Sequence, residues 1–432
     1  MRGLIISWFY PPVNASEGLV TYKLLESSGI GHDVFTQRND LEWSYTSGEK
    51  NEFPFINSTP IYFDTTNTNK WIKAGITHYY NNMSKYDFIM TRSMTINSHK
   101  VALAIKQRCP SIKWIASFSD PFIQNPFLLL KSDFLDDDYI KAKKCDSILE
   151  FLSPVRFMNI FMLMYKRKSH AKYVNETKKL SEDVYAFADA LIVTSKWQQK
   201  YMFEKYDEII RKKVWVLPHS FKKDLYKTES LNQNKKLTFT YTGHLDEMRT
   251  PMLFLEAVNE LKKRIDDLHD SFIVNFYGSI PANCKLYIMD NELSDVIIYK
   301  DIIGYIESLE VMQQSDWLLH IDADISKVVE YNIFFAAKLA DYMGTGRPIF
   351  AVTMDKGTTN EILDSYQNSV VCNMDANNIV NALYSIIIGK IKQPGKVQNG
   401  EYDSRVVAGL YDGKVKELVN NNVKGYSYVC SS

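Results

Sequence analysis

The sequence predicts an α/β protein made of two successive doubly wound halves, each built around its own parallel sheet. Short apolar runs alternate with longer helical patterns, which is typical of βα units. The same alternation begins afresh after residues 220–236, a polar stretch rich in Lys and Asn. A chain of 432 residues also exceeds what one hydrophobic core usually supports, so we expect two domains.

Apolar runs mark the expected strands. The first is Leu4–Phe9, which ends at a Pro11-Pro12 turn before a helix expected over Glu17–Ser27. The other strands of the first half are expected at 33–36, 88–90, 114–118, 190–193 and 214–217. Those of the second half are expected at 237–241, 272–277, 296–299, 317–321 and 348–352, with an amphipathic helix over 251–264.

These elements define the expected domains. We predict an N-terminal domain over 1–220, a C-terminal domain over 221–395 and a helical tail over 396–432, with packing against the N-terminal domain as one option for the tail. Parallel sheets bind ligands beyond the carboxyl ends of their strands. The chemistry is therefore expected in the loops that follow Phe9, Phe118, Tyr241 and Ile321.

Composition argues against several classes of protein. Basic and acidic residues number 51 each, so no overall field favours nucleic acid. The five cysteines are scattered, lack metal-ligand spacing and suggest reduced thiols. The first apolar run is too short for a signal peptide, and no run reaches the roughly 18 apolar residues of a membrane span. We expect a cytoplasmic protein that needs no metal or other cofactor.

Two segments of the second half carry candidate chemistry. In Tyr241–Arg249, Gly243 permits close backbone approach, and Arg249 offers a planar fork suited to diphosphate oxygens just before a helix N-terminus. A turn glycine and a solvated arginine are the alternative. Farther along, Lys338 and Asp341 share a helical face, where they suit a phosphate and a ribose or form an exposed ion pair.

The motifs resemble retaining glycosyltransferases of the GT-B fold, of the family-four type. The run Glu330–Pro348 is similar to their donor-site motif P-x-K-L-x-E-Y-x-x-x-G-K-P, and Lys113–Phe122 to the W-x-x-D-x-R-D-P-W of a polysaccharide-building subgroup. Residues 189–195 and 216–221 fall where that family has D-A-I-I-x-x-S and V-I-P-N-G. The resemblance covers nearly the whole chain in order, and it implies two Rossmann-like domains that face each other across a cleft.

The resemblance also implies a donor site. Its residues would be Gly243, Arg249, Glu330, Lys338 and Asp341. Asp341 stands where the family has a glutamate on the donor ribose, and Arg249 where it has the basic residue on the diphosphate. A second family glutamate, which touches the transferred sugar, is replaced here by Ile333.

On the acceptor side the candidates are Gly18, His99 and Asp120. Asp120 follows a strand and precedes a proline, at a place where many family members carry a histidine. It either contacts the acceptor or the transferred sugar, or caps the next turn. Gly18 lies near a helix start suited to phosphate, whereas His99 either serves the site or fills space beneath the loop. We expect Asp120, Arg249 and Lys338 to be catalytic, with fixed positive charge replacing a metal.

Residues 151–168 combine Met and Phe side chains with Lys166-Arg167-Lys168. Such a helix either lies on an anionic membrane, where a lipid-linked acceptor would be found, or is buried in the fold. The three consecutive residues Asp136–Asp138 are expected to form an exposed acidic turn.

The sequence thus predicts a metal-independent hexosyltransferase of surface polysaccharide or lipid-linked glycan assembly. Its partners would be a nucleotide diphosphate sugar and a glycan or lipid-linked acceptor, at the inner face of the membrane if the basic helix binds lipid. Two alternatives stay open. One is a nucleotide-sugar epimerase of the same fold, which needs acid/base carboxylates and histidine in the cleft. The other is a non-catalytic glycan-binding relative, because position 333 lacks an acid.

Overall fold

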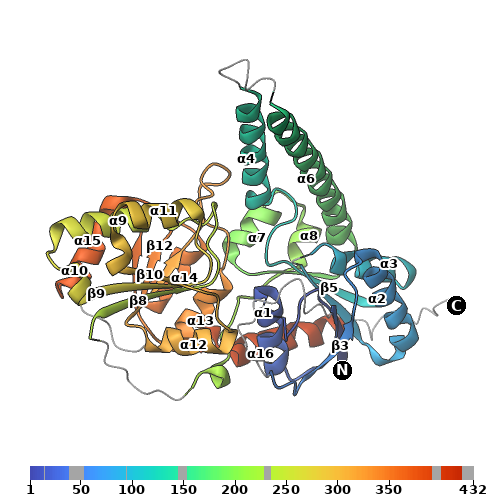
Figure 1. Cartoon of the computed structure of the whole chain (residues 1–432). Helices are drawn as coiled ribbons and strands as arrows, with labels where there is room; N and C mark the ends of the chain where they lie inside the picture. The colour runs from blue at the N-terminus through green and yellow to red at the C-terminus, as the bar shows by residue number, and fades with distance from the viewer. Residues whose placement is uncertain are drawn as a thin grey trace.

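The computed structural model describes residues 1–13, 15–37, 53–93, 95–144, 153–227, 235–391 and 400–420. Within these ranges the chain forms two parallel sheets, one in each half, with helices packed against both (Figure 1). The fold class predicted from the sequence, two Rossmann-like α/β domains, is confirmed.

The first sheet has the strand order β3-β2-β1-β4-β5-β6-β7. Its strands are β1 (Arg2–Ile6), β2 (Gly31–Gln37), β3 (Ser58–Phe63), β4 (Phe88–Arg92), β5 (Lys113–Ser117), β6 (Ala190–Val193) and β7 (Val214–Val216). Its helices are α1 (Ser16–Ser27), α2 (Thr68–Asn82), α3 (Asn97–Arg108), α4 (Pro126–Lys143), α6 (Pro154–Phe187), α7 (Lys196–Phe203) and α8 (Glu208–Lys212). The central strands are buried on both faces, which explains their continuous apolar runs.

The second sheet has the strand order β10-β9-β8-β11-β12-β13. Its strands are β8 (Leu237–Thr242), β9 (Phe272–Tyr277), β10 (Ile297–Lys300), β11 (Trp317–Ile321), β12 (Ile349–Val352) and β13 (Ser369–Cys372). The helices are α9 (Met252–Arg264), α10 (Leu268–Ser271), α11 (Ala282–Asp290), α12 (Tyr305–Gln314), α13 (Ala337–Thr345), α14 (Thr358–Tyr366) and α15 (Ala376–Ile387), followed by α16 (Ser404–Asn420).

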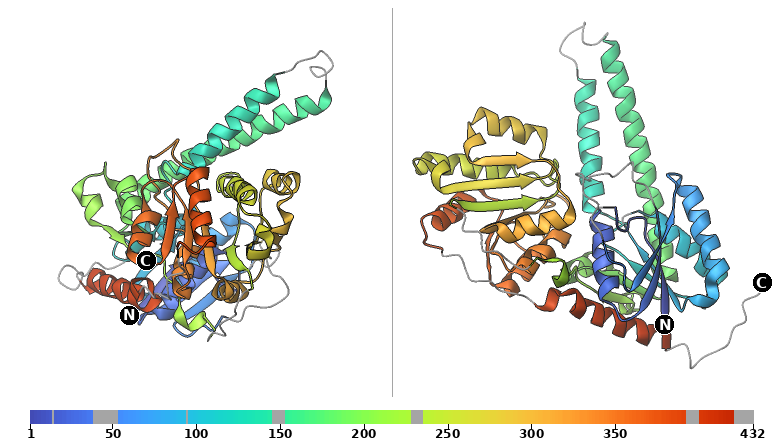
Figure 2. Two further views of the ribbon diagram at one scale, coloured as in Figure 1. Left: turned by 90° about the vertical axis from the view of Figure 1, so that its left-hand side faces the viewer. Right: turned by 60° about the horizontal axis from the view of Figure 1, so that its bottom comes forward.

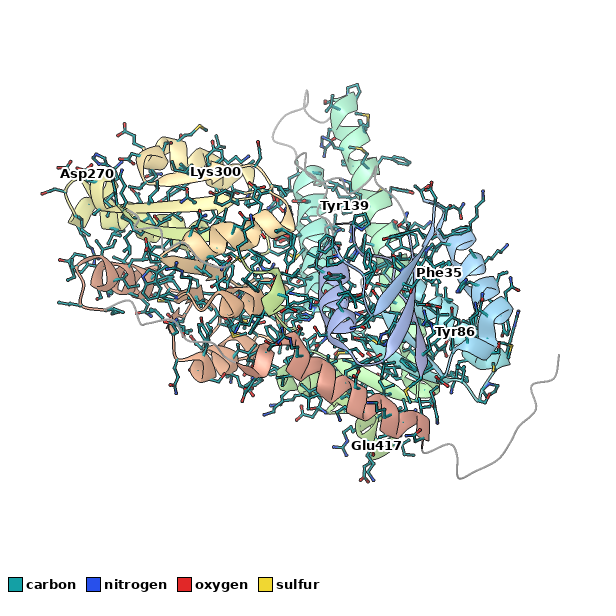
Figure 3. All side chains as sticks on the ribbon, turned by 90° about the horizontal axis from the view of Figure 1, so that it is seen from below. Phe35, Tyr86, Tyr139, Asp270, Lys300 and Glu417 are labelled. Atoms are coloured by element: carbon teal, nitrogen blue, oxygen red, sulfur yellow. The ribbon has the colours of Figure 1, made fainter. Side chains whose placement is uncertain are left out.

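The last helix, α16, returns to the first half of the chain. Its Asp412 accepts hydrogen bonds from the Ser28 hydroxyl at 2.5 Å and from the Gly29 amide at 2.7 Å. Figure 3 shows this helix, labelled at Glu417, running beneath the half that carries Phe35 and Tyr86, away from Asp270 and Lys300 of the second half. The domain boundaries at 220 and 395 stay predictions.

The acidic turn expected at Asp136–Asp138 is wrong, because these residues lie inside α4. The Asn125 side chain caps the helix by accepting from the Phe127 amide at 2.9 Å, and Pro126 occupies the first turn. With that start fixed, the helix continues through the aspartates. Arg167 of α6 holds Asp136 at 2.5 Å.

A buried ion pair joins the two halves. The Lys23 ammonium of α1 lies 2.7 Å from Oδ1 of Asp341 on α13, and both side chains are almost fully buried. The Tyr305 hydroxyl donates to the same oxygen at 3.0 Å. Leu339 and Tyr342 of α13 belong to the same apolar cluster as Tyr22 of α1. The contact between the two domains is therefore an apolar cluster that surrounds the ion pair between Lys23 and Asp341.

We expect the Asp341→Ala variant to lose about 3–5 kcal/mol of unfolding free energy, because it leaves Lys23 charged and buried without a partner. Chemical denaturation measures the loss. The double variant Lys23→Met/Asp341→Leu should recover most of it. The matched control is Asp224→Ala, which breaks surface ion pairs with Lys222 and Arg405 and should cost less than about 1 kcal/mol. Equal losses in the two single variants would contradict the interpretation.

Candidate active site

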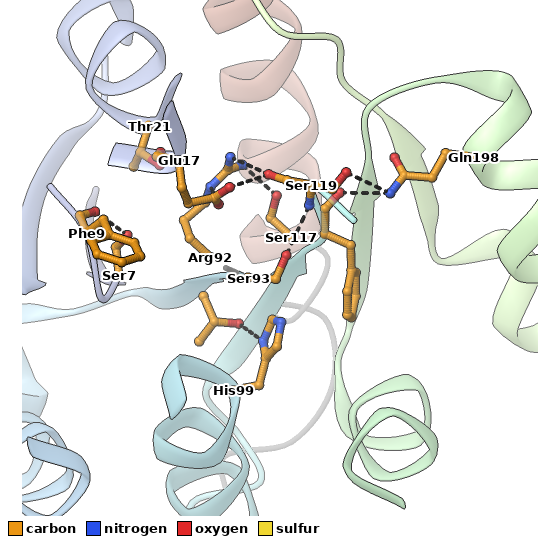
Figure 4. Close-up of polar contacts among 12 residues, drawn as sticks. Ser7, Phe9, Glu17, Thr21, Arg92, Ser93, His99, Ser117, Ser119 and Gln198 are labelled. Carbon is orange, nitrogen blue, oxygen red and sulfur yellow. Dashed lines mark hydrogen bonds and ion pairs between the residues drawn. The ribbon is translucent and has the colours of Figure 1, made fainter. Parts of the chain in front are cut away.

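The carboxyl edge of the first sheet carries a buried ion pair. Glu17, in the first turn of α1, lies 2.8 Å from Nε of Arg92 at the end of β4. Arg92 also donates to the Ser117 hydroxyl at 2.7 Å, and the Ser119 hydroxyl donates to Glu17. Figure 4 shows these side chains converging above the strand ends. The pair fixes the loop in which Ser119 and Asp120 stand.

Asp120 is half-buried directly beside this pair. Burial raises the pKa of its carboxyl to about 6, and the charge of Glu17 adds to the rise, while Arg249 of the other domain opposes it. Arg249 therefore lies near enough to act on Asp120 across the domain boundary. A carboxyl with this pKa can change its protonation state near neutral pH.

The carboxyl edge of the second sheet places Lys338 against Gly243. Gly243 ends the strand β8 with a φ of 115°, and a Cβ on it would lie 2.9 Å from Nζ of Lys338. The ammonium donates to the Tyr241 hydroxyl and lies 3.8 Å from the centroid of that ring. Glycine at 243 thus provides both the backbone conformation and the space for the lysine.

Arg249 is held at the end of the same loop. The Asp246 carboxylate accepts from the backbone amides of Met248 at 3.0 Å and of Arg249 at 2.8 Å, so it shapes the turn that leads to α9. The Nε of Arg249 is buried and has no hydrogen-bond partner among the described residues. The side chain as a whole is half-buried, so a ligand can reach part of it.

These two cations repel each other. Burial lowers the pKa of Lys338 well below its usual value, the charge of Arg249 lowers it further, and Asp322 opposes the shift. In the described part of the chain Lys338 donates to the Tyr241 hydroxyl, and the Nε of Arg249 has no hydrogen-bond partner. An anion placed between them would satisfy Arg249 and favour the charged form of Lys338. The arrangement is that of an anion site.

Asp322, at the end of β11, is already occupied. It accepts from Asn332 at 2.7 Å, Thr353 at 2.7 Å and Thr359 at 2.6 Å. Burial works against its charge, but His320 and the threonine hydroxyls lower its pKa to about 2. This network fixes the loop that precedes α13, and thereby the position of Lys338.

The other predicted donor residues lie apart from the two cations. Asp341 has its Oδ1 engaged by Lys23 and Tyr305, and it does not pair with Lys338. Glu330 is 88% exposed and lies 3.8 Å from Lys356. Ile333 is fully buried in an apolar cluster.

Two predicted acceptor-side residues act as supports. Gly18 is buried, and a Cβ there would lie 3.0 Å from the backbone of Tyr10, so the glycine lets α1 pack against the loop after β1. His99 is fully buried, its Nδ1 bonded to the Thr91 hydroxyl at 2.7 Å. Burial, with a smaller contribution from Arg92, lowers the pKa of His99 to about 3, so the ring is neutral at physiological pH.

Sequence reasoning missed Glu17, Arg92 and Asp322. Arg92 ends β4 and Asp322 follows β11, at positions where a charged side chain ends an apolar run, whereas Glu17 lies in the first turn of α1. A charged residue at the end of an apolar run could therefore have been selected from the sequence. The pairing of Glu17 with Arg92 could not, because 75 residues separate them. His219, buried in the connection between the domains, was also missed.

Other sites were sought in the described ranges. They contain no group of three His, Cys, Asp or Glu side chains suited to a metal, and none of their helices is long and apolar enough to cross a membrane. A surface hollow lined by Tyr201, Met202, Lys205, Tyr206 and Tyr331 contains none of the predicted site residues.

Comparison with known proteins identifies the fold. No family model and no curated protein sequence matches the chain. A sucrose-phosphate synthase from Thermosynechococcus elongatus aligns over 98% of this chain and 100% of its own, with a TM-score of 0.62 and 13% identity. A lipopolysaccharide outer core galactosyltransferase aligns over 96% of this chain and 99% of its own, with a TM-score of 0.55 and 11% identity. A putative UDP-N-acetylglucosamine 2-epimerase from Listeria monocytogenes aligns over 99% of this chain and 99% of its own, with a TM-score of 0.54 and 10% identity. At these identities the likeness shows the GT-B fold alone.

The raised pKa of Asp120 predicts a pH-dependent stability. Because the native pKa of about 6 exceeds that of the unfolded chain, this group's stabilisation is present below about pH 4 and lost as pH rises through 6. We expect Asp120→Asn to unfold with a free energy on the order of 1–2 kcal/mol higher than wild type at pH 7.5, with the difference vanishing near pH 4. Denaturation at several pH values measures it.

The control for this prediction is Asp64→Asn, at an exposed position of the same domain. It should change stability by less than about 0.5 kcal/mol at every pH. An Asp120→Asn protein that is less stable than wild type at pH 7.5 would show that the carboxylate is favoured, not disfavoured, at its site.

Proposed function

We propose that the chain is a glycosyltransferase that uses a nucleoside diphosphate sugar. The observation that carries the proposal is the pair Arg249 and Lys338, two basic side chains that act on each other at the carboxyl edge of a parallel sheet, with the buried Nε of Arg249 lacking a hydrogen-bond partner among the described residues. This edge is where such folds bind phosphate groups. The structural likeness to glycosyltransferases supports the same class of reaction.

In this proposal the reaction is helped mainly by fixed charge. The oxygen of the acceptor hydroxyl forms a bond to the sugar's anomeric carbon as the bond to the diphosphate oxygen breaks. The electron pair leaves with the diphosphate, and the hydroxyl proton passes to the leaving diphosphate oxygen. Arg249 and Lys338 stabilise that charge without a metal. Asp120, half-buried and near Arg249, contacts the acceptor hydroxyl or the transferred sugar. Retention of configuration is proposed from the motif resemblance.

We also propose that Asp341 and Glu330 serve the donor, as the resemblance implies. For Asp341 this requires the ribose to compete with Lys23 for the carboxylate, so donor binding and the domain contact would be linked. Gly243 contributes through its backbone. The exposed Glu330 lies on the loop that the Asp322 network fixes.

The biological setting is proposed as surface polysaccharide or lipid-linked glycan assembly on the cytoplasmic side of a membrane. Its support is the motif resemblance and the likeness to a lipopolysaccharide galactosyltransferase. An epimerase is the second candidate, because a putative UDP-N-acetylglucosamine 2-epimerase shares the fold and Asp120 is suited to proton transfer.

A panel of nucleotide sugars tests the proposal. The protein is incubated with each sugar, with and without glycan acceptors and with EDTA present, and the products are separated. We expect release of nucleoside diphosphate together with glycosylated acceptor. Isomerised donor would identify an epimerase, and binding without turnover a non-catalytic relative. Activity that EDTA abolishes and Mg²⁺ restores would overturn metal independence.

Arg249→Met should lower kcat/KM on the order of 10- to 100-fold, because the diphosphate loses a charge-assisted contact, whereas Arg249→Lys keeps part of the activity. The matched control is Arg264→Met at the other end of α9, where the side chain contacts Asn381. If Arg249→Met matches the control, the diphosphate binds elsewhere.

Diphosphate binding should also take up a proton through Lys338. Burial and Arg249 lower the pKa of this lysine, and a bound anion raises it again. Calorimetry of UDP, GDP and ADP binding at pH 8 in two buffers of different ionisation enthalpy measures the uptake. We expect up to about one proton for wild type and none for Lys338→Met. Lys263→Met, on the exposed face of α9, should behave as wild type.

A further inference from the structure

Helices α4 and α6 form a hairpin that stands out from the body of the protein. At 1.5 Å per residue, their 18 and 34 residues correspond to about 27 Å and 51 Å. Figures 1 and 2 show the two helices side by side and projecting in every view. No described residue of α6 before Thr177 is buried, so the outer part of the helix rests on α4 alone.

Polar contacts cross the seam between the two helices, beside apolar side chains such as Leu135, Ile160 and Leu163. His170 of α6 donates to the Leu128 carbonyl at 2.9 Å, and Arg167 pairs with Asp136. Nearer the tip, Arg156 donates to the Lys143 carbonyl at 2.6 Å. In an ordinary helical hairpin the outer surface is polar. Here the seam takes up Ile160 and Leu163, and the other apolar side chains of this part of α6 lie outside it.

Those apolar side chains point outward. Between 46% and 71% of each remains exposed for Val155, Phe157, Met158, Phe161, Met162, Met164 and Tyr165. At 100° per residue they spread over about half of the helix circumference, opposite the seam. Burial of this segment in the fold, one of the two alternatives from the sequence, is therefore wrong for its described residues. Phe151 lies outside the described residues.

The same part of the hairpin is strongly basic. The hairpin from Pro126 to Lys168 has eight basic and six acidic residues, a net charge of +2, and its tip, Tyr139 to Lys168, has seven basic and two acidic residues, a net charge of +5. The two acidic residues, Asp146 and Glu150, lie in the undescribed range 145–152. Positive charge is thus concentrated next to the exposed apolar surface.

We propose that this hairpin docks on an anionic lipid bilayer. The apolar arc of α6 enters the boundary between headgroups and acyl chains, and exposed lysines such as Lys144, Lys166 and Lys168 bind the headgroups. The proposal deepens the proposed function in one respect and rests on it there: a docked enzyme would meet a lipid-linked acceptor.

A bilayer fits this surface better than a protein partner does. One helix packed against α6 would cover a stripe of roughly 100°, about half of the exposed apolar arc. A bilayer surrounds the whole arc. A second copy of the chain would bring two regions of charge +5 together, which repel each other.

Vesicle co-sedimentation of the full chain, without donor, tests the proposal. The probes are vesicles of phosphatidylcholine alone and of phosphatidylcholine with phosphatidylglycerol, at 50 mM and 500 mM salt. We expect binding to the anionic vesicles that high salt weakens. Replacing Lys144, Lys166 and Lys168 by Gln should weaken it on the order of 100-fold. Phe157→Ser/Phe161→Ser should weaken it at least about tenfold.

The matched control is Leu286→Ser/Met289→Ser, which changes two side chains of α11 that are 54% and 53% exposed. It should bind vesicles as wild type does. All variants should keep wild-type affinity for nucleoside diphosphates, so a failure of docking is distinguished from a failure of the proposed function. Absent binding, or binding that ignores lipid charge, would overturn the proposal. So would a stable wild-type dimer that Phe157→Ser/Phe161→Ser dissociates.

Discussion

The arrangement of the candidate site depends on the buried ion pair between Lys23 and Asp341. It ties the first helix of one domain to α13, the helix that also carries Lys338. Because α13 is short and its apolar residues pack into the same cluster as α1, any shift between the domains must move Lys338 relative to Asp120. A buried ion pair in this place is costly to break, and it holds the two domains in one relative orientation. Such a contact suits an enzyme whose site is assembled from both domains.

Each sheet edge combines satisfied charges with one or two that the fold does not satisfy. On the first edge Glu17 pairs with Arg92 and Asp120 is left over, and on the second Asp322 is held by hydrogen bonds beside Arg249 and Lys338. Each domain keeps a group whose pKa is displaced against its charge: the carboxyl of Asp120 upward and the ammonium of Lys338 downward. Both displacements cost stability in the empty protein, and a bound anion with its acceptor would relieve the second. The site therefore contains charged groups that lack partners in the empty protein and that a bound ligand would supply with partners.

The sequence predicted the central strands because their apolar runs are buried on both faces, as in β4 and β11. It did not predict β3 and β13, which lie at the sheet edges and are half-exposed, so their patterns are weak. Arg249, Lys338 and Gly243 could be selected because each belongs to a local motif. The partner of Asp341 could not, since 318 residues separate it from Lys23. A sequence pattern indicates the local surroundings of a residue, whereas a contact between residues far apart in the sequence is known only from the fold.

The motif that this chain resembles has a glutamate at the position of Ile333, and the surroundings of Ile333 account for the difference. Ile333 is fully buried in an apolar cluster with Leu130 of α4, and its neighbour Phe334 stacks on Phe127 at 4.4 Å. A carboxylate in this cluster would be charged and unpaired, which the low dielectric penalises heavily. The base of the hairpin, whose helix α4 begins six residues beyond Asp120, thus packs against the loop that carries Ile333. We propose that contact with the transferred sugar passes instead to Asp120, the half-buried carboxylate that faces Arg249 across the domain boundary.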